Sequence, residues 1–250
     1  GTGLGGGQPD SGQPFAHEGL DGAQAQLLAE TTKKVQELGW AVVPGIIPSS
    51  EIAAVRESTL ETLARRDAEE AASTAEPSPE FSGKHRTIEL GARVSGSWVS
   101  VNDSLWPYLE HPQVLGVAEN LWRTTYIKVT STSPIPRFPN PDGTPLPRDN
   151  RGFHSDWPYN THNHAAFVPE PYSIESPLHL TVIFILSPFT VENATLIVPL
   201  SHKLGHNYLS KHDPPVTNAF DNELPEPLPE PLVQTPGVGP EGGVLMFDSR

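Results

Sequence analysis

Apolar residues in the first part of the chain recur at helical spacing, with a short strand-like segment between two helical stretches. From Asp21 the apolar positions return every three or four residues until Gly39, which predicts an amphipathic helix that ends at this glycine. The run Trp40–Val43 is apolar and rich in Val, and a Pro-Gly pair follows it, so we expect a short strand there.

A second amphipathic stretch follows this strand. Ser49 or Ser50 is placed to act as its N-cap, and the apolar side of the predicted helix consists of Ile52, Val55, Leu60 and Leu63. Residues 67–84 are charged or small and contain prolines, which indicates a surface loop. The apolar spacing further predicts a helix from His111 to Trp122 and a strand from Tyr126 to Ser131.

The most apolar segment lies in the second half of the chain. Leu180–Leu186 is apolar on both faces and contains β-branched residues, so we predict a central, buried strand. Further strands are expected at Ala194–Val198 and Val244–Phe247, whereas the proline-rich segments 134–152 and 214–240 would lie outside a sheet. Helices followed by short strands and long loops predict a mostly β fold with flanking helices, either an antiparallel barrel or a double-sheet jelly roll.

Length and composition limit the classes of protein that remain. The 250 residues allow one large domain, and we expect a flexible segment at 1–20 followed by a single domain at 21–250. The chain contains no Cys, which excludes a disulfide scaffold, a thiolate metal site and a cysteine nucleophile. A formal net charge of −14 argues against a nucleic-acid partner, because phosphate backbones are bound by concentrated positive charge.

The hydropathy pattern bears on membranes and on the kind of partner. No apolar run reaches the roughly 18 residues that a membrane span needs, and no basic and apolar leader opens the chain. We therefore expect a soluble protein without a membrane partner, with the cytoplasm as the first choice of compartment. The acidic surface favours a small-molecule substrate over a polyanionic carrier such as a CoA thioester.

The densest polar cluster in the sequence is FHSDW at 153–157. In a strand, residues i and i+2 point to the same face, so His154 and Asp156 would converge on one point. An imidazole and a carboxylate so placed are two members of the 2-His-1-carboxylate triad, which binds Fe(II) and leaves coordination positions open. The alternative is a histidine and an aspartate that only hydrogen-bond within a loop.

The order of motifs along the chain resembles the phytanoyl-CoA dioxygenase family of Fe(II)/2-oxoglutarate oxygenases. The resemblance extends over about residues 30–250 and includes the FHSDW motif. Its other segments are ELGWAVVPGIIPSSEIAAVR at 37–56, HLTVIFILSPFTVENATLIVPLSHK at 179–203 and GGVLMFDSR at 242–250.

The resemblance implies a double-stranded β-helix (jelly-roll or cupin-like) with flanking helices, and with it an iron site and a reaction class. Iron would be held by His154, Asp156 and a histidine that follows the final strand, with 2-oxoglutarate as cosubstrate and O2 as oxidant. A small organic substrate would be hydroxylated, or oxidised in a related way such as desaturation, with release of succinate and CO2. The retained Asp156 speaks against halogenation. The second histidine and the arginine that binds 2-oxoglutarate are expected beyond Arg250, so we expect the chain to continue past that residue.

Further candidates concern the cosubstrate and the substrate. The resemblance implies a Ser or Thr hydroxyl near 2-oxoglutarate, which points to Thr181; the alternative is an inward Thr that bonds to the backbone. Lys128 would need an anion partner such as 2-oxoglutarate if it points into the barrel, and it is a solvent-facing lysine if it points outward. Trp157 and Tyr159 are candidate walls of the substrate pocket, with core packing as the alternative.

The sequence departs from the family pattern in the segment 179–203. Asn193 is followed by Ala194 where the family turn has Gly, and Leu200 stands where the family has Gly before Ser-His. Because Gly permits a positive φ, Leu200 predicts a different local backbone path. The alternative third iron ligands in the chain are His162, His164, His179, His202 and His206.

Other functions remain open from the sequence. One is a catalytically inactive relative that acts as a binding or structural module. The other is a jelly-roll carbohydrate- or metal-binding domain of unrelated ancestry, because a fold by itself does not determine function.

Overall fold

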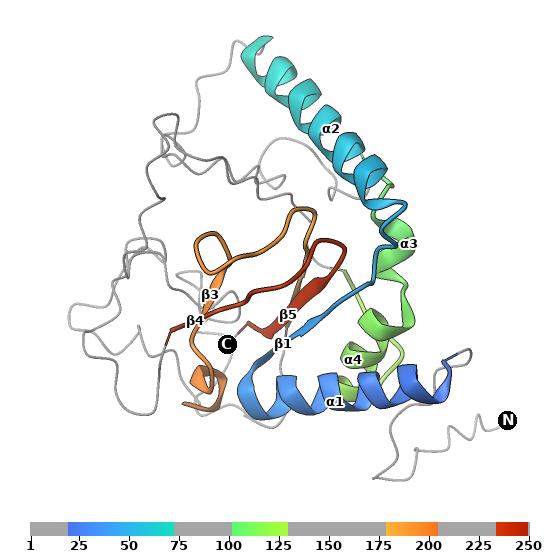
Figure 1. Cartoon of the computed structure of the whole chain (residues 1–250), viewed down its shortest axis with the longest axis vertical. Helices are drawn as coiled ribbons and strands as arrows, with labels where there is room; N and C mark the ends of the chain where they lie inside the picture. The colour runs from blue at the N-terminus through green and yellow to red at the C-terminus, as the bar shows by residue number, and fades with distance from the viewer. Residues whose placement is uncertain (1–19, 73–101, 130–178, 205–233, 250) are drawn as a thin grey trace, which may run out of the picture.

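The computed structural model of the chain describes residues 20–72, 102–129, 179–204 and 234–249 (Figure 1). Several predictions from the sequence lie outside these residues. They concern the segments 1–19 and 134–152, most of 214–240, and the candidate site residues His154, Asp156, Trp157 and Tyr159.

The first helix, α1, spans Gly22–Leu38, as predicted. Its start is set by a capping box: Gln24 N donates to Asp21 Oδ1 at 2.9 Å, and Asp21 N donates to Gln24 Oε1 at 3.0 Å. Its end is set by Gly39, which adopts a left-handed conformation with φ 88°. Both ends therefore follow from local chemistry that can be read in the sequence.

The second helix, α2, spans Ile52–Ala72 and is longer than predicted. The loop expected from residue 67 onward is wrong for 67–72, because this stretch contains only residues compatible with a helix and no Gly or Pro. Leu60 is 46% exposed, so its assignment to the buried side is also wrong. Thr59 is buried in its place and satisfies its hydroxyl by donating to Val55 O at 2.8 Å.

The helix expected at 111–122 is confirmed as α4, Pro112–Trp122, with His111 as its N-cap. A short helix that was not predicted, α3, precedes it at Trp106–Leu109. The strand expected from Tyr126 is wrong for 126–129, which has no regular secondary structure. Tyr126 is 93% exposed and Ile127 packs against the core, but the segment pairs with no described strand.

A three-stranded antiparallel sheet forms the centre of the described structure, in the order β1 (Trp40–Val43), β5 (Val244–Asp248), β2 (Leu180–Phe184). The strands expected near these positions are confirmed. The central strand is β5, however, whereas β2 pairs with β5 alone among the described residues, so the central place predicted for Leu180–Leu186 is not found in this sheet.

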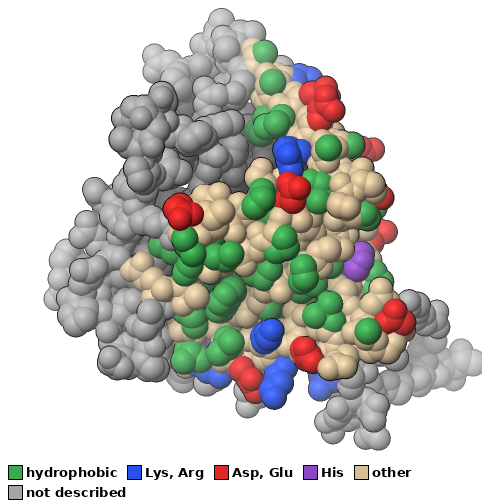
Figure 2. Space-filling model, viewed as in Figure 1, with side chains coloured by type: hydrophobic (Ala, Val, Ile, Leu, Met, Phe, Trp, Pro, Cys, Tyr) green, Lys and Arg blue, Asp and Glu red, His purple; other side chains and the backbone are tan. Residues whose placement is uncertain are grey.

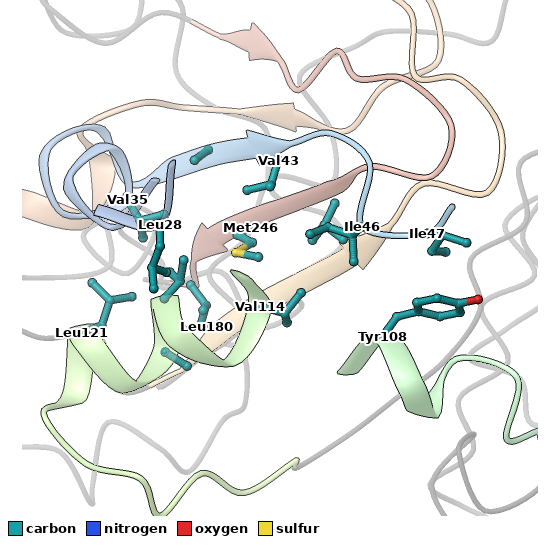
Figure 3. Packing of buried hydrophobic residues seen from close by; sticks show 14 of the residues in the cluster. Leu28, Val35, Val43, Ile46, Ile47, Tyr108, Val114, Leu121, Leu180 and Met246 are labelled. Atoms are coloured by element: carbon teal, nitrogen blue, oxygen red, sulfur yellow. The ribbon is translucent and has the colours of Figure 1, made fainter. Parts of the chain in front are cut away.

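One face of this sheet packs on α1 and α4 (Figure 3). Leu28 and Val35 of α1 and Val114 of α4 belong to the same buried cluster as Val43 and Met246 of the sheet. These side chains exclude water from one another, and the hydrophobic effect thereby attaches the helices to the strands. Alternate residues along β1, β5 and β2 must then face the other side.

That other face lies against a second, smaller sheet formed by β3 (Leu196–Ile197) and β4 (Thr235–Pro236). The prediction that the segment 214–240 lies outside a sheet is therefore wrong for 235–236, because a two-residue strand at the edge of a sheet tolerates a proline. The chain after β4 approaches the large sheet closely: a Cβ at Gly239 would lie 2.8 Å from Ile185 Cδ1 and 2.9 Å from Val42 Cγ1. The strand predicted at Ala194–Val198 is confirmed in part, since only its middle residues pair. A 3-10 helix, η4, follows at Ser201–Leu204.

The described residues thus form helices on one side of an antiparallel sheet and a second antiparallel sheet on its other side (Figure 1). This arrangement agrees with the predicted helix-flanked β architecture, while closure into a double-stranded β-helix stays a prediction. Acidic and basic side chains lie beside one another along α1 (Figure 2), which agrees with the Lys33–Glu37 ion pair. Within the described ranges, no helix has the length and apolar character needed to cross a membrane.

Candidate functional site

The strand register places one predicted site residue, Thr181, on the face of the sheet that looks away from α1 and α4. Thr181 lies opposite Phe247, and Phe247 lies opposite Trp40 on its other side. Residues directly opposite in antiparallel strands share a face, so these three side chains form one row across β2, β5 and β1. All three are half-buried.

Two further polar residues extend this face at the end of the strands. Ser249 follows Phe247 by two residues, and His179 precedes Thr181 by two, so both share the face of the row. Ser249 Oγ lies 2.6 Å from Thr181 Oγ1 and 3.1 Å from His179 Nδ1. The backbone also joins them, since Ser249 N donates to His179 O at 3.3 Å. We call His179, Thr181 and Ser249 the hydroxyl cluster.

The hydroxyl cluster is sheltered from solvent. Ser249 is only 2% exposed, and His179 and Thr181 are half-buried. Breaking a hydrogen bond in such surroundings costs free energy, because water cannot readily reach the groups that are left unpaired. This cost keeps the three side chains in place.

Trp40, at the far side of the same row, carries an unusual feature. Its indole Nε1 is buried and has no hydrogen-bond partner in the described structure. A buried N–H without an acceptor costs free energy, and such groups call for an explanation such as a missing ligand or water. The face therefore offers an indole donor and a threonine hydroxyl on either side of the apolar ring of Phe247.

This set of groups fits a carboxylate ligand. Hydroxyls and N–H groups in a partly dehydrated site donate the charge-assisted hydrogen bonds that carboxylates accept. The described residues do not by themselves supply a metal site, because no three His, Asp or Glu side chains within them come together as ligands. His154 and Asp156, the predicted iron ligands, lie outside the described residues, and their role stays a prediction.

The structure places the other predicted residues as follows. Lys128 lies in an irregular segment and is exposed, which agrees with the outward-facing alternative, and its role toward 2-oxoglutarate is untested. Thr181 faces away from the helices, and its hydroxyl bonds to Ser249, 68 residues away, so the alternative of a purely local backbone bond does not account for its contacts. Trp157 and Tyr159 lie outside the described residues.

Two of the alternative third ligands, His179 and His202, lie within the described residues. His202 is 4% exposed, and its Nε2–H donates to Gln36 O at 3.1 Å, so this ring is committed to the end of α1. His179 belongs to the hydroxyl cluster. The remaining candidates, His162, His164 and His206, lie outside the described residues.

The two departures from the family pattern have different structural outcomes. Ala194 is not among the residues with positive φ, so a glycine is not required at this position. Asn193 ties the turn instead, because its Oδ1 accepts from Thr190 N at 2.7 Å. Leu200 adopts φ 70°, so the prediction that it would change the backbone path away from the left-handed region is wrong. Its amide donates to Leu38 O at 3.0 Å, and this tertiary bond holds the strained conformation.

Sequence reasoning missed Ser249, Trp40 and the role of His179. The signal was present as strand alternation, since Ser249 follows Phe247 at the spacing of one face and His179 precedes Thr181 likewise. Strand alternation does not give the pairing register of β2 with β5, and it is this register that brings Ser249 next to Thr181 and His179.

Comparison with known proteins identifies the family. The profile of the family described as phytanoyl-CoA dioxygenase (PhyH) matches residues 35–250. The chain belongs to this family. The match excludes the alternative of an unrelated jelly-roll domain, and it includes the HSD motif at 154–156, the strand β5 and Ser249, which follows that strand directly.

Among solved structures, the chain is similar to the non-heme alpha ketoglutarate dependent epimerase SnoN from nogalamycin biosynthesis. The two share 14% sequence identity with a TM-score of 0.48, and the alignment covers 90% of this chain and 75% of SnoN. No curated protein sequence matches the chain. Membership in the PhyH family supports activity of the Fe(II)/2-oxoglutarate oxygenase type.

Proposed function

We propose that this PhyH-family protein is a non-haem Fe(II)- and 2-oxoglutarate-dependent dioxygenase that hydroxylates, or otherwise oxidises, a small organic substrate with release of succinate and CO2. The observation that carries the proposal is the family match over residues 35–250. The hydroxyl cluster adds support, because it gathers polar groups suited to a carboxylate where the family resemblance implied the cosubstrate.

The chain supplies the residues that would hold the metal and the cosubstrate. His154 and Asp156 would bind Fe(II) together with a histidine beyond the final strand, and the metal with 2-oxoglutarate would supply the oxidising chemistry. Thr181 would donate a hydrogen bond to a 2-oxoglutarate carboxylate, and Lys128 is a second candidate counter-charge. Trp157 and Tyr159 would wall the substrate site.

The described residues near Thr181 would form an apolar wall of the cosubstrate site and exclude water from it. The ring of Phe247 and the indole of Trp40 lie in the same row and cover the sheet beside Thr181. Apolar surroundings lower the local dielectric, which strengthens a hydrogen bond from Thr181 to a carboxylate. The buried Nε1–H of Trp40 would gain an acceptor if a ligand oxygen reached it.

Anaerobic titration of the full-length protein with Fe(II) and then 2-oxoglutarate tests the proposal. Chelation of iron by the keto acid gives a weak visible charge-transfer band, and we expect this band in the intact protein and its loss in His154→Ala and Asp156→Ala. Exposure to O2 should then convert 2-oxoglutarate to succinate. A matched control is His111→Asn, because His111 caps α4 and lies on another part of the fold.

Absence of the band and of succinate from the intact protein would contradict the proposal. That outcome would leave the second interpretation, a catalytically inactive relative that serves as a binding or structural module. Neither departure from the family pattern favours this second interpretation, since Asn193 ties its turn and Leu200 keeps the left-handed backbone.

A further inference from the structure

We infer that His179 is a positioning residue that acts through Ser249 to direct the hydroxyl proton of Thr181 toward a carboxylate of 2-oxoglutarate. The inference rests on the proposed function, since it names a residue for the same site. It starts from the chain of short contacts in which Ser249 Oγ lies between Thr181 Oγ1, at 2.6 Å, and His179 Nδ1, at 3.1 Å.

Proton accounting shows why the state of His179 matters. A hydroxyl has one proton to donate and two lone pairs to accept with. If Nδ1 of His179 carries no proton, Ser249 must donate to it, and Thr181 must then donate to Ser249. The Thr181 oxygen would present only lone pairs in other directions, and these repel a carboxylate.

The opposite arrangement suits an anion. If Nδ1 of His179 carries a proton, it donates to Ser249, which leaves the Ser249 proton available for donation to Thr181. Thr181 then directs its own proton away from Ser249. A hydroxyl that donates to a carboxylate makes a charge-assisted bond, which is about twice as strong as a neutral one. The structure thus couples the imidazole to the donor capacity of a hydroxyl that it does not touch directly.

Burial makes this relay persistent. Ser249 is 2% exposed, so solvent does not readily take the place of either partner. The register also holds the two ends together, because Leu180 pairs with Asp248 and Ser249 N donates to His179 O at 3.3 Å. His179 and Ser249 therefore share a strand end that the sheet itself keeps in place.

A double-mutant cycle on 2-oxoglutarate affinity tests the relay. The dissociation constant of 2-oxoglutarate is measured anaerobically on the full-length Fe(II) protein, by calorimetry and by the charge-transfer band. We expect Thr181→Val to weaken binding roughly tenfold, the size expected for one hydrogen bond to a charged group. Ser249→Ala and His179→Leu should each weaken binding several-fold on the native background and have almost no effect when Thr181 is already Val.

Control variants distinguish a loss of positioning of the Thr181 hydroxyl from a general loss of folded structure. Ser249→Thr keeps the hydroxyl and should restore most of the affinity. Thr32→Val makes the same substitution as Thr181→Val at a buried α1 residue whose hydroxyl donates to Leu28 O at 2.9 Å, and it should leave the affinity unchanged. The unfolding temperature of each variant without ligand shows how much of any effect is structural.

A second measurement observes the proton on His179 in the native cluster. In protein labelled with ¹⁵N-histidine and loaded with diamagnetic Zn(II), the 2-oxoglutarate complex should show a histidine with a protonated Nδ1, assigned to His179 by its absence in His179→Gln. Nδ1 without a proton in this complex would overturn the inference, as would equal effects of Ser249→Ala on both Thr181 backgrounds. Failure of the intact protein to bind 2-oxoglutarate would overturn the proposed function together with this inference, whereas binding with additive variants would overturn the inference alone.

Discussion

The imidazole of His202 lies directly against Gly39, so that a Cβ at position 39 would come within 2.6 Å of His202 Nδ1. Gly39 ends α1 in the left-handed conformation, and His202 Nε2–H donates to Gln36 O in the last turn of the same helix. The end of α1, the start of β1 and η4 are thus joined at one point, next to the strand end that carries the hydroxyl cluster.

This contact predicts that Gly39→Ala is strongly destabilising. The substitution strains a backbone at φ 88° and displaces a buried ring, and we expect a loss of about 2–4 kcal/mol in the free energy of unfolding. Gly22→Ala is the matched control, because nothing lies within 4 Å of its Cβ and Ala is the better helix former. Urea denaturation of both variants checks the prediction, which would be wrong if the two were equally stable.

At Leu200 we expect the opposite substitution, from a larger residue to Gly, to increase stability. A non-glycine residue at φ 70° costs about 1–2 kcal/mol, and Gly relieves this strain at the expense of unfolded-state entropy and some side-chain contact. We expect Leu200→Gly to be up to about 1 kcal/mol more stable and Leu200→Val to be clearly less stable. A loss of stability in Leu200→Gly would mean that the partly buried side chain outweighs the backbone strain.

His111 predicts a loss of stability in mild acid. Its imidazole caps α4 by accepting from Gln113 N at 3.2 Å, and burial lowers its pKa below the ordinary 6.5. The unfolded chain therefore takes up the proton first as the pH falls, so stability should decline below pH 6.5 and stay constant above it. His111→Asn retains a capping acceptor without a titration and should flatten this part of the pH profile of urea unfolding.

Tyr108 predicts a loss of stability in alkali. Burial, together with the hydrogen bond that its hydroxyl donates to the Glu51 carboxylate, raises its pKa from 10.0 to about 12. The unfolded tyrosine loses its proton first, so this contribution is complete below pH 10 and disappears as the pH rises toward 12. Subtracting the profile of Tyr108→Phe from that of the native protein isolates the effect from other groups, and a difference that does not change over this interval would refute it.

Arg56 connects α2 to the segment that follows β2 and the turn that precedes β5 by two contacts of unequal strength. Its Nε–H donates to Leu186 O at 2.6 Å, and its guanidinium pairs with Glu241 at 2.5 Å with both side chains more than a third exposed. Exposed ion pairs contribute little, so Glu241→Gln should cost less than about 1 kcal/mol. Arg56→Met also removes the partner of a carbonyl and should cost about 1–3 kcal/mol. Equal losses in the two variants would show that the ion pair dominates.

The elements whose ends depend on neighbours in sequence were predictable. Asp21 with Gln24 starts α1 and Gly39 ends it, and His111 starts α4, because a helix end needs only nearby groups to satisfy its free N–H and C=O groups. The same reasoning failed where the burial of a residue depends on a segment that is distant in sequence. Leu60 has the spacing of a buried residue but faces solvent, whereas Thr59 is buried and Asn102, about 40 residues away, bonds to Ser58 and Thr62 on this part of α2.

The sequence by itself determined the helices α1 and α4, the start of α2, the strands β1, β2 and β5, the charge and the motifs that place the chain in the PhyH family. The tertiary structure alone decided that β5 lies between β1 and β2, that Leu200 adopts a left-handed backbone and that Ser249 lies between His179 and Thr181. The physical reason is the range of the interactions. Caps and periodicity act over one or two turns, whereas a strand register joins residues about 70 positions apart and is set by what the whole sheet can bury.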